Sequence, residues 1–305
     1  MLRRWHQINL FRFSLVTLSM TVLVILWGAY VRATGAGAGC GNHWPLCNGA
    51  IVPRLPIVET LVEFTHRITS ALAFLLVLGQ WVIVRKKYAS GHRMRFLAAL
   101  AMLFMVFEAL IGAVLVLFDL VALNTSFARA AVGSLHLLNT FILLAMITLV
   151  ADGSRFQLEG RFITTGMRFG FLLAGILGML LIGMSGAIAA LGDTLFPSES
   201  FLVGLAQELT SDAHLLIRLR VWHPFIAVIA TLLVFVGLRL SPPGNRQPPY
   251  LRLILAILLS TQLLIGVINV LLLAPVFLQI VHLLLADLIW IGLIVYANHS
   301  QREID

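Results

Sequence analysis

Four of the nine histidines in this 305-residue chain lie inside long apolar runs. They are His66, His136, His223 and His282. An ionisable side chain is costly in such a run, and where one occurs it usually faces the interior of a helix bundle and has a function. Because neutral imidazole is a common metal ligand, the four residues predict a metal site. The other five, predicted to be solvated or interfacial residues of tails and loops, are His6, His43, His92, His214 and His299.

The spacing of the four histidines follows an internal repeat. His223 follows His66 by 157 residues, and His282 follows His136 by 146. The segment G28-A-Y-V-R-A-T-G corresponds to G186-A-I-A-A-L-G-D, and L110-I-G-A-V corresponds to L264-I-G-V-I, at offsets of 158 and 154. Four offsets within 146–158 residues indicate duplicated structural units. The chain is therefore predicted to contain two halves with two histidines each.

The amino-acid composition indicates the class of protein to which these four histidines belong. Apolar residues make up 60% of the chain and charged residues 11%, against roughly 25% charged residues in a typical globular protein. With a mean hydropathy of +0.99, the chain is predicted to be an integral membrane protein. Disordered proteins, disulfide-rich secreted scaffolds and nucleic-acid binders are excluded. The net charge of +8 comes from arginines and lysines between apolar runs, which is typical of membrane topology.

Eight stretches reach the roughly 20 apolar residues that a membrane-spanning helix needs. They lie near 13–33, 64–84, 96–118, 131–150, 169–190, 217–238, 251–273 and 278–297. The predicted fold is all-α, with eight transmembrane helices arranged as two pseudo-symmetric four-helix bundles, residues 1–160 and 161–305. The joint is placed in the polar segment 151–168, and S241-P-P-G-N-R-Q-P-P forms the inner loop of the second half. The first apolar run lacks a cleavage site and is expected to be retained.

The distribution of cations predicts the orientation. An even number of spans places both termini on one side, and 15 of the 21 cations fall on that side. The six others are Arg32, Arg54, Arg67, Arg129, Arg218 and Arg220. By the positive-inside rule both termini are cytoplasmic. Each of the four histidines then lies in the first two turns of its helix, near the outer face. Two histidines at one depth on parallel helices are the arrangement that binds a haem iron from both sides.

Two alternatives to haem remain open for these histidines. Zinc fits less well, because no third or fourth Cys, Asp or Glu converges at equivalent repeat positions. A structural role without metal is the other alternative.

The two halves differ next to their first histidine. The first half has E63-F-T-H66-R and the second has R220-V-W-H223-P. Glu63 lies one turn from His66 on the same helix face, where it can accept a proton, stabilise a developing cation, or pair with Arg67 or Arg129. Arg220 holds the matching place and is predicted to bind a haem propionate. The first half is thus equipped for acid–base chemistry and the second for holding a cofactor.

Four further side chains have predicted roles. Cys40 and Cys47 lie in the first outer loop, C40-G-N-H-W-P-L-C47, and are expected to form a disulfide on the oxidising side of a bacterial membrane. A loop metal site that includes His43 is the alternative. Glu108 and Asp287 lie at membrane depth and are expected to be carboxyls satisfied by a neighbouring helix, with a proton path as the alternative. Gln262 occupies the repeat position of Glu108, which favours hydrogen bonding.

The chain resembles the haem A synthase family over nearly its full length. The resemblance rests on eight spans, one histidine on each even-numbered span, and the loop T34-G-A-G-A-G-C-G-N-H-W-P-L-C-N-G-A-I-V-P followed by E63-F-T-H66-R. It implies that haem O, the substrate, binds between His66 and His136, with Glu63 as the catalytic carboxylate. It also implies a permanent haem b between His223 and His282. The chain departs from the family pattern in Pro224, where many members have Arg, and in lacking a second cysteine pair.

The resemblance further implies the reaction and the partners. The C8 methyl group of haem O is oxidised through an alcohol to the formyl group of haem A, the haem of terminal oxidases. Haem O synthase is the expected substrate donor, and the electron acceptor is unidentified. A homo-oligomer is compatible with the sequence, nucleic acid is not an expected partner, and the expected location is a bacterial or archaeal cell membrane. Two rival functions are a di-haem b-type electron-transfer cytochrome and a haem transporter or chaperone.

Overall fold

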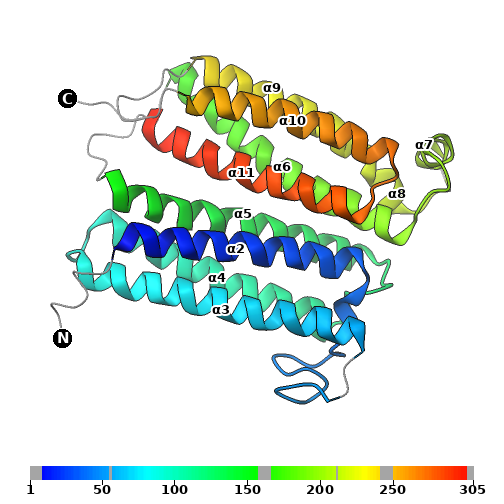
Figure 1. The fold of residues 1–305 in the computed structure, drawn as a ribbon. Helices are drawn as coiled ribbons and strands as arrows, with labels where there is room; N and C mark the ends of the chain where they lie inside the picture. Colours follow the sequence, from blue (N-terminus) through cyan, green and yellow to red (C-terminus); the bar gives the residue numbers. More distant parts are fainter. Residues whose placement is uncertain (1–8, 55–56, 157–165, 211, 241–249, 301–305) are drawn as a thin grey trace.

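The structure, a computed structural model, describes residues 9–54, 57–156, 166–210, 212–240 and 250–300 (Figure 1). Its helices are α2 (Leu10–Ala33), the short 3-10 helix η1 (Ala36–Ala38), α3 (Val58–Lys87), α4 (Arg93–Leu117), α5 (Phe127–Phe156), α6 (Gly166–Leu195), α7 (Phe201–Leu209), α8 (Leu215–Arg220), α9 (Trp222–Leu240), α10 (Leu251–Leu271) and α11 (Val276–Ser300). Eight segments are long and apolar enough to cross a membrane, which confirms the predicted number of spans and the all-α membrane class.

The helices extend further than the apolar runs that predicted them. α3 begins at Val58 rather than near 64, and α5 begins at Phe127 rather than near 131. His66 and His136 therefore lie in the third turn of their helices, and the prediction that all four histidines lie in the first two turns was wrong. A helix satisfies its own backbone hydrogen bonds in lipid and in water, so it can continue through polar interfacial residues such as Glu59.

Two features near the start of the sixth span were not predicted. This span consists of α8 and α9, which are separated at Val221. Pro224 lies in the first turn of α9, where a missing backbone N–H costs no helical hydrogen bond. Before it comes α7, a helix too short to span a membrane, which Ser200 caps by accepting a hydrogen bond from the backbone N–H of Val203.

The spanning helices lie side by side in the order of the two predicted halves. In Figure 1, α2, α3, α4 and α5 occupy the lower part and α6, α9, α10 and α11 the upper part. Across the boundary, α5 contacts α6 and α11, and α2 contacts α11. The predicted boundary at 160/161 and the Pro-rich loop 241–249 lie outside the described residues, so the division into two pseudo-symmetric bundles stays a prediction. We name the end of the molecule that carries the loop 34–57 and α7 the outer end, after the predicted orientation.

Apolar packing joins the two groups of helices at mid-length. The largest buried cluster combines side chains of α5 with side chains of α6, α9, α10 and α11. At its centre Phe141 stacks on Trp290, with ring centroids 5.4 Å apart, and the Trp290 indole N–H donates to the Phe141 carbonyl over 2.7 Å. Both side chains are fully buried. This contact fixes α11 against α5.

Polar contacts join the same groups at the outer end. The guanidinium of Arg32, in the last turn of α2, donates to the Ala190 carbonyl over 2.7 Å and to the Thr194 hydroxyl over 2.9 Å. Its other terminal nitrogen donates to the side-chain oxygen of Gln279 over 2.8 Å. One arginine of the first half therefore holds the end of α6 and the start of α11.

A second polar cluster joins the groups at the inner end. Asp152 of α5 accepts from the Asn298 amide over 2.7 Å and lies 3.0 Å from the Nε2 atom of His299. Arg93 of α4 in turn donates to Asn298 over 3.2 Å. His299 is only 4% exposed, so its prediction as a solvated tail residue was wrong. The reason is that α11 continues to Ser300 and carries His299 onto the end of α5.

Of the other histidines predicted in tails and loops, three are exposed: His43, His92 and His214. His6 lies outside the described residues.

Candidate functional site

The second pair of histidines, His223 on α9 and His282 on α11, lies with one ring nearly perpendicular to the other. The ring centroids of His223 and His282 are 6.4 Å apart, and the ring planes meet at 79°. Two imidazole nitrogens on one metal ion at about 2 Å each place the ring centroids roughly 6 to 6.5 Å apart. The observed separation therefore fits a single iron ion held from both sides, as in a bis-histidine haem.

Each ring of this pair has a polar neighbour on the preceding spanning helix. The Nδ1 atom of His223 lies 3.1 Å from the hydroxyl oxygen of Ser185 on α6. The Nε2 atom of His282 lies 3.2 Å from the amide nitrogen of Gln262 on α10. Sequence reasoning did not assign Ser185. The available signal was its place directly before Gly186, which begins the repeated segment.

In the first pair neither ring has a hydrogen-bond partner at Nδ1. The Nδ1 atoms of His66 and His136 are buried and unpaired among the described residues, as is that of His282 in the second pair. Glu108 approaches His136 Nδ1 only to 3.6 Å, because its oxygens accept from Asn139 and Thr140 of α5, each over 2.5 Å. The buried, unpaired nitrogens fit residues that bind a group from outside the chain.

All four rings lie against a glycine of the preceding spanning helix. The pairs are Gly28 with His66, Gly112 with His136, Gly186 with His223 and Gly266 with His282. A Cβ atom added to these glycines would lie 3.0, 3.9, 3.1 and 3.3 Å from the imidazole Cε1, in that order. These are the glycines of the repeated segments, so the repeat preserves a seat for each ring.

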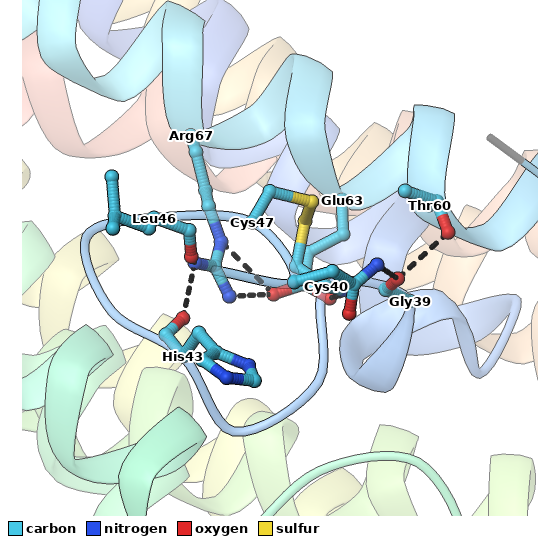
Figure 2. The surroundings of a disulfide bond; sticks show 9 residues. Gly39, Cys40, His43, Leu46, Cys47, Thr60, Glu63 and Arg67 are labelled. Carbon is cyan, nitrogen blue, oxygen red and sulfur yellow. Dashed lines mark hydrogen bonds and ion pairs between the residues drawn. A yellow bond between two sulfur atoms is a disulfide. The ribbon is translucent and has the colours of Figure 1, made fainter. Parts of the chain in front are cut away.

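Glu63 connects the histidine-bearing helix α3 to the disulfide loop (Figure 2). One oxygen of the buried Glu63 carboxylate accepts from the backbone N–H of Cys40 over 2.7 Å. The other pairs with Arg67, one helical turn further along α3. Cys40 and Cys47 form a disulfide, as predicted, so neither thiol is free for the alternative metal site with His43.

The loop is held by further contacts on α3. Arg67 donates to the carbonyl of His43 over 2.5 Å and to that of Leu46 over 2.6 Å, and the Thr60 hydroxyl donates to the Gly39 carbonyl over 2.7 Å. Only a glycine fits at position 39, because an added Cβ would lie 2.3 Å from the backbone of Glu59. The loop, Glu63 and Arg67 thus form one unit beside His66.

Arg129 was considered as a partner of Glu63 and Arg220 as a partner of a haem propionate, but both contact other groups of the chain. Arg129 donates to the carbonyls of Ala122 and Asn124 rather than to Glu63. Arg220 pairs with Glu208 over 2.5 Å and with Asp193 over 3.2 Å, which ties α7 and the end of α6 to α8. In this arrangement its charge is already balanced by carboxylates of the chain, and a propionate contact stays a prediction.

The two acidic residues at membrane depth, Glu108 and Asp287, differ in their hydrogen bonding. Glu108 is satisfied by the neighbouring helix α5, as predicted. Asp287 is fully buried, and neither carboxyl oxygen has a hydrogen-bond partner among the described residues, so the same prediction was wrong for Asp287. The reason is that this part of α11 belongs to the largest apolar cluster, to which the neighbouring Ala286, Ile289 and Trp290 of the same helix contribute. Across the described ranges no group of three or more His, Cys, Asp and Glu side chains converges on one point.

The chain is similar to one protein family and to several named proteins. Residues 11–294 match the family model COX15-CtaA, described as cytochrome oxidase assembly protein. The chain is 50% identical over 292 residues to a protein of Thermus thermophilus named protoheme IX farnesyltransferase, a match that covers 92% of this chain and 46% of that protein.

Two further relatives carry the name heme A synthase. The one from Bacillus licheniformis is 34% identical over 156 residues, which are 51% of this chain and 50% of the relative. The one from Bacillus cereus is 41% identical over 100 residues, or 33% and 32%. The chain thus spans about half the length, or less, of these relatives. Because the family model covers nearly all of the chain, the protein belongs to the COX15-CtaA family of cytochrome oxidase assembly proteins.

Proposed function

We propose that this protein is a haem A synthase, an oxidoreductase of the cell membrane that acts on the C8 methyl group of haem O. The overall change is –CH3 + H2O → –CHO + 4 H⁺ + 4 e⁻, with an alcohol at the halfway point. The observation that carries the proposal is the asymmetry of the two histidine pairs. Both are built on the same repeat, but among the described residues a buried carboxylate one turn before a histidine, Glu63, occurs in the first pair alone.

In this proposal the halves have different tasks. His223 and His282 of residues 161–305 would hold a resident haem b, which when bound would supply the electron-accepting chemistry toward an unidentified acceptor. His66 and His136 of residues 1–160 bind haem O, and their unpaired nitrogens support this role. Oxidation of a methyl group develops positive charge, and a fixed carboxylate stabilises such charge. Glu63 is fixed because Cys40 and Arg67 hold both of its oxygens.

The relative named protoheme IX farnesyltransferase bears on the partner. This chain matches only 46% of that protein. We propose that farnesyl transfer belongs to its unmatched part, and that the present chain works beside a haem O synthase. In that relative, a single polypeptide would then carry both activities, and haem O would pass directly from farnesyl transfer to oxidation. The membrane orientation proposed with this function has both termini in the cytoplasm and the disulfide loop outside.

One observation favours a rival function, a di-haem electron-transfer cytochrome. Both oxygens of Glu63 already have partners within the chain, so the carboxylate can be explained as a structural anchor of the disulfide loop. In that case neither haem is a substrate, and both sites keep haem B. The identity of the extracted haems separates the two functions.

The deciding experiment is co-expression with a haem O source, followed by extraction and reversed-phase separation of the haems. The wild type should yield haem B together with haem O, its alcohol or haem A. Glu63→Gln keeps an acceptor for the Cys40 N–H but loses the charge, and should lower haem A roughly 100-fold while haem B is retained. The matched control is Glu59→Gln, an exposed glutamate one turn earlier on α3, which should leave haem A unchanged.

Two outcomes would contradict the proposal. Unchanged haem A in Glu63→Gln would remove the catalytic role of Glu63. Two haem B per wild-type chain, with no haem O, alcohol or haem A, would overturn the synthase and support the cytochrome.

A further inference from the structure

The protonation state of His223 can be worked out from its neighbour on α6. The Ser185 hydroxyl oxygen lies 3.1 Å from His223 Nδ1 and 3.1 Å from the Ile182 carbonyl oxygen. A serine hydroxyl has one proton to donate, and a carbonyl can only accept. When the Ser185 hydroxyl donates to the Ile182 carbonyl, its oxygen accepts a hydrogen bond from Nδ1–H of His223. In a neutral imidazole the other nitrogen, Nε2, then carries a free lone pair.

Gly186, the residue after Ser185, provides a second contact between α6 and the His223 ring. A Cβ atom at this position would lie 3.1 Å from His223 Cε1 and 3.5 Å from Nδ1, so the absence of a side chain lets this ring edge lie on the α6 backbone. The Nε2 atom of His282 instead lies 3.2 Å from the amide nitrogen of Gln262, which can only donate, and its Nδ1 atom has no partner among the described residues. The hydrogen bond to Ser185 therefore favours Nε2 as the ligating nitrogen of His223 alone.

The first half has the same glycine seat without the hydrogen bond. Trp27 precedes Gly28 as Ser185 precedes Gly186, but the Trp27 indole N–H donates to the Val62 carbonyl over 3.0 Å. The Nδ1 atom of His66 is left without a partner among the described residues. Nothing equivalent to Ser185 in the described part of the first half therefore fixes which nitrogen of His66 carries the proton.

We infer that Ser185 is the positioning residue that makes the second half retain its haem, and that its lack in the first half leaves that haem exchangeable. The inference rests on the proposed function, because it explains why one site holds a cofactor and the other a substrate. A hydrogen bond to the second nitrogen of a ligating histidine fixes the tautomer and the ring orientation and makes the imidazole a stronger ligand. Loss of such a partner typically weakens metal binding by about 10- to 100-fold.

The test uses the purified full-length protein with its bound haem B. The variants are Ser185→Ala, which removes the hydroxyl, and Ser185→Thr, which keeps it. The matched control is Ser260→Ala, because the Ser260 hydroxyl bonds the Ala256 carbonyl within α10. The readouts are the rate of haem B transfer to excess apomyoglobin, the reduction potential, and the electron paramagnetic resonance spectrum of the low-spin ferric haem.

Ser185→Ala should lose haem B roughly ten times faster and show a higher reduction potential, because its ligand donates less charge to the iron. Ser185→Thr and Ser260→Ala should resemble the wild type in rate, potential and spectrum. An unchanged rate and potential in Ser185→Ala would overturn the role of Ser185 while leaving the synthase proposal intact. A wild-type protein purified without haem B would instead overturn the proposed function itself.

Discussion

Alanine at the four glycines that seat the histidine rings should change stability in opposite directions. In a helix interior alanine is about 1 kcal/mol more favourable than glycine. Overpacking in a closely packed place costs roughly 1 to 3 kcal/mol. At Gly112 the new Cβ would lie 3.9 Å from His136, an ordinary contact, so the propensity gain of about 1 kcal/mol remains.

At Gly28 the balance reverses. The new Cβ would lie 3.0 Å from Cε1 and 3.3 Å from Nε2 of His66, so the ring or the helix must move. With an overpacking cost of roughly 2 kcal/mol against a gain of about 1, Gly28→Ala should be destabilising by about 1 kcal/mol. The two variants together therefore differ by about 2 kcal/mol although the chemical change is the same.

Thermal unfolding of the purified protein in detergent, followed by tryptophan fluorescence, measures this difference. The midpoint should rise for Gly112→Ala and fall for Gly28→Ala. Gly133→Ala is the control, since it lies on α5 one turn before His136 and its Cβ would meet nothing within 4 Å, and it should raise the midpoint. Equal midpoints for Gly28→Ala and Gly112→Ala would refute the idea that the glycines set the positions of the rings.

Three further variants test the contacts between the two groups of helices, each by its unfolding midpoint. Asp152→Ala should cost roughly 3 to 5 kcal/mol, because it leaves the buried His299 without its partner. Trp290→Phe should cost about 1 to 3 kcal/mol, because the stack is kept while the buried Phe141 carbonyl loses its donor. Arg32→Met should cost about 2 kcal/mol, because charged hydrogen bonds to both α6 and α11 disappear.

A control variant is needed for these three losses of stability. Arg54→Met removes an exposed arginine of the outer loop and should leave the midpoint within error of the wild type. A wild-type midpoint for Arg32→Met or Asp152→Ala would mean that the polar clusters do not hold the groups together. A wild-type midpoint for Trp290→Phe together with a large loss in Trp290→Ala would assign the stability to the aromatic stack rather than to the hydrogen bond.

The sequence predicted the spans and the histidine pairs because both depend on properties that act along one helix. Apolar length determines whether a helix crosses a membrane, and the repeat determines which histidines share a half. The pairing of Glu63 with Arg67 was also within reach, since the two residues are one turn apart. The hydrogen bond from Cys40 was not, because it depends on how the loop folds back onto α3.

Contacts between distant helices could not be predicted for the same reason. His299 was predicted to be a tail residue because nothing in its neighbourhood shows that the ends of α5 and α11 meet. Arg220 was predicted to be an available cation because Glu208 lies on α7, a nine-residue helix with too little apolar length to be recognised. The role of Ser185 depends on which edge of the His223 ring faces α6, and a sequence does not contain that information.

The contacts between the two groups of helices have a consequence for the entry of a large planar substrate. They lie at three depths: Arg32 at the outer end, the Phe141–Trp290 stack at mid-length, and Asp152 with His299 at the inner end. We expect two groups of helices joined at three depths to resist the rocking that the repeats of many transporters undergo. We therefore expect haem to enter sideways from the lipid, past helices that stay in place, with the rate set by local side-chain and loop movement rather than by hinge motion.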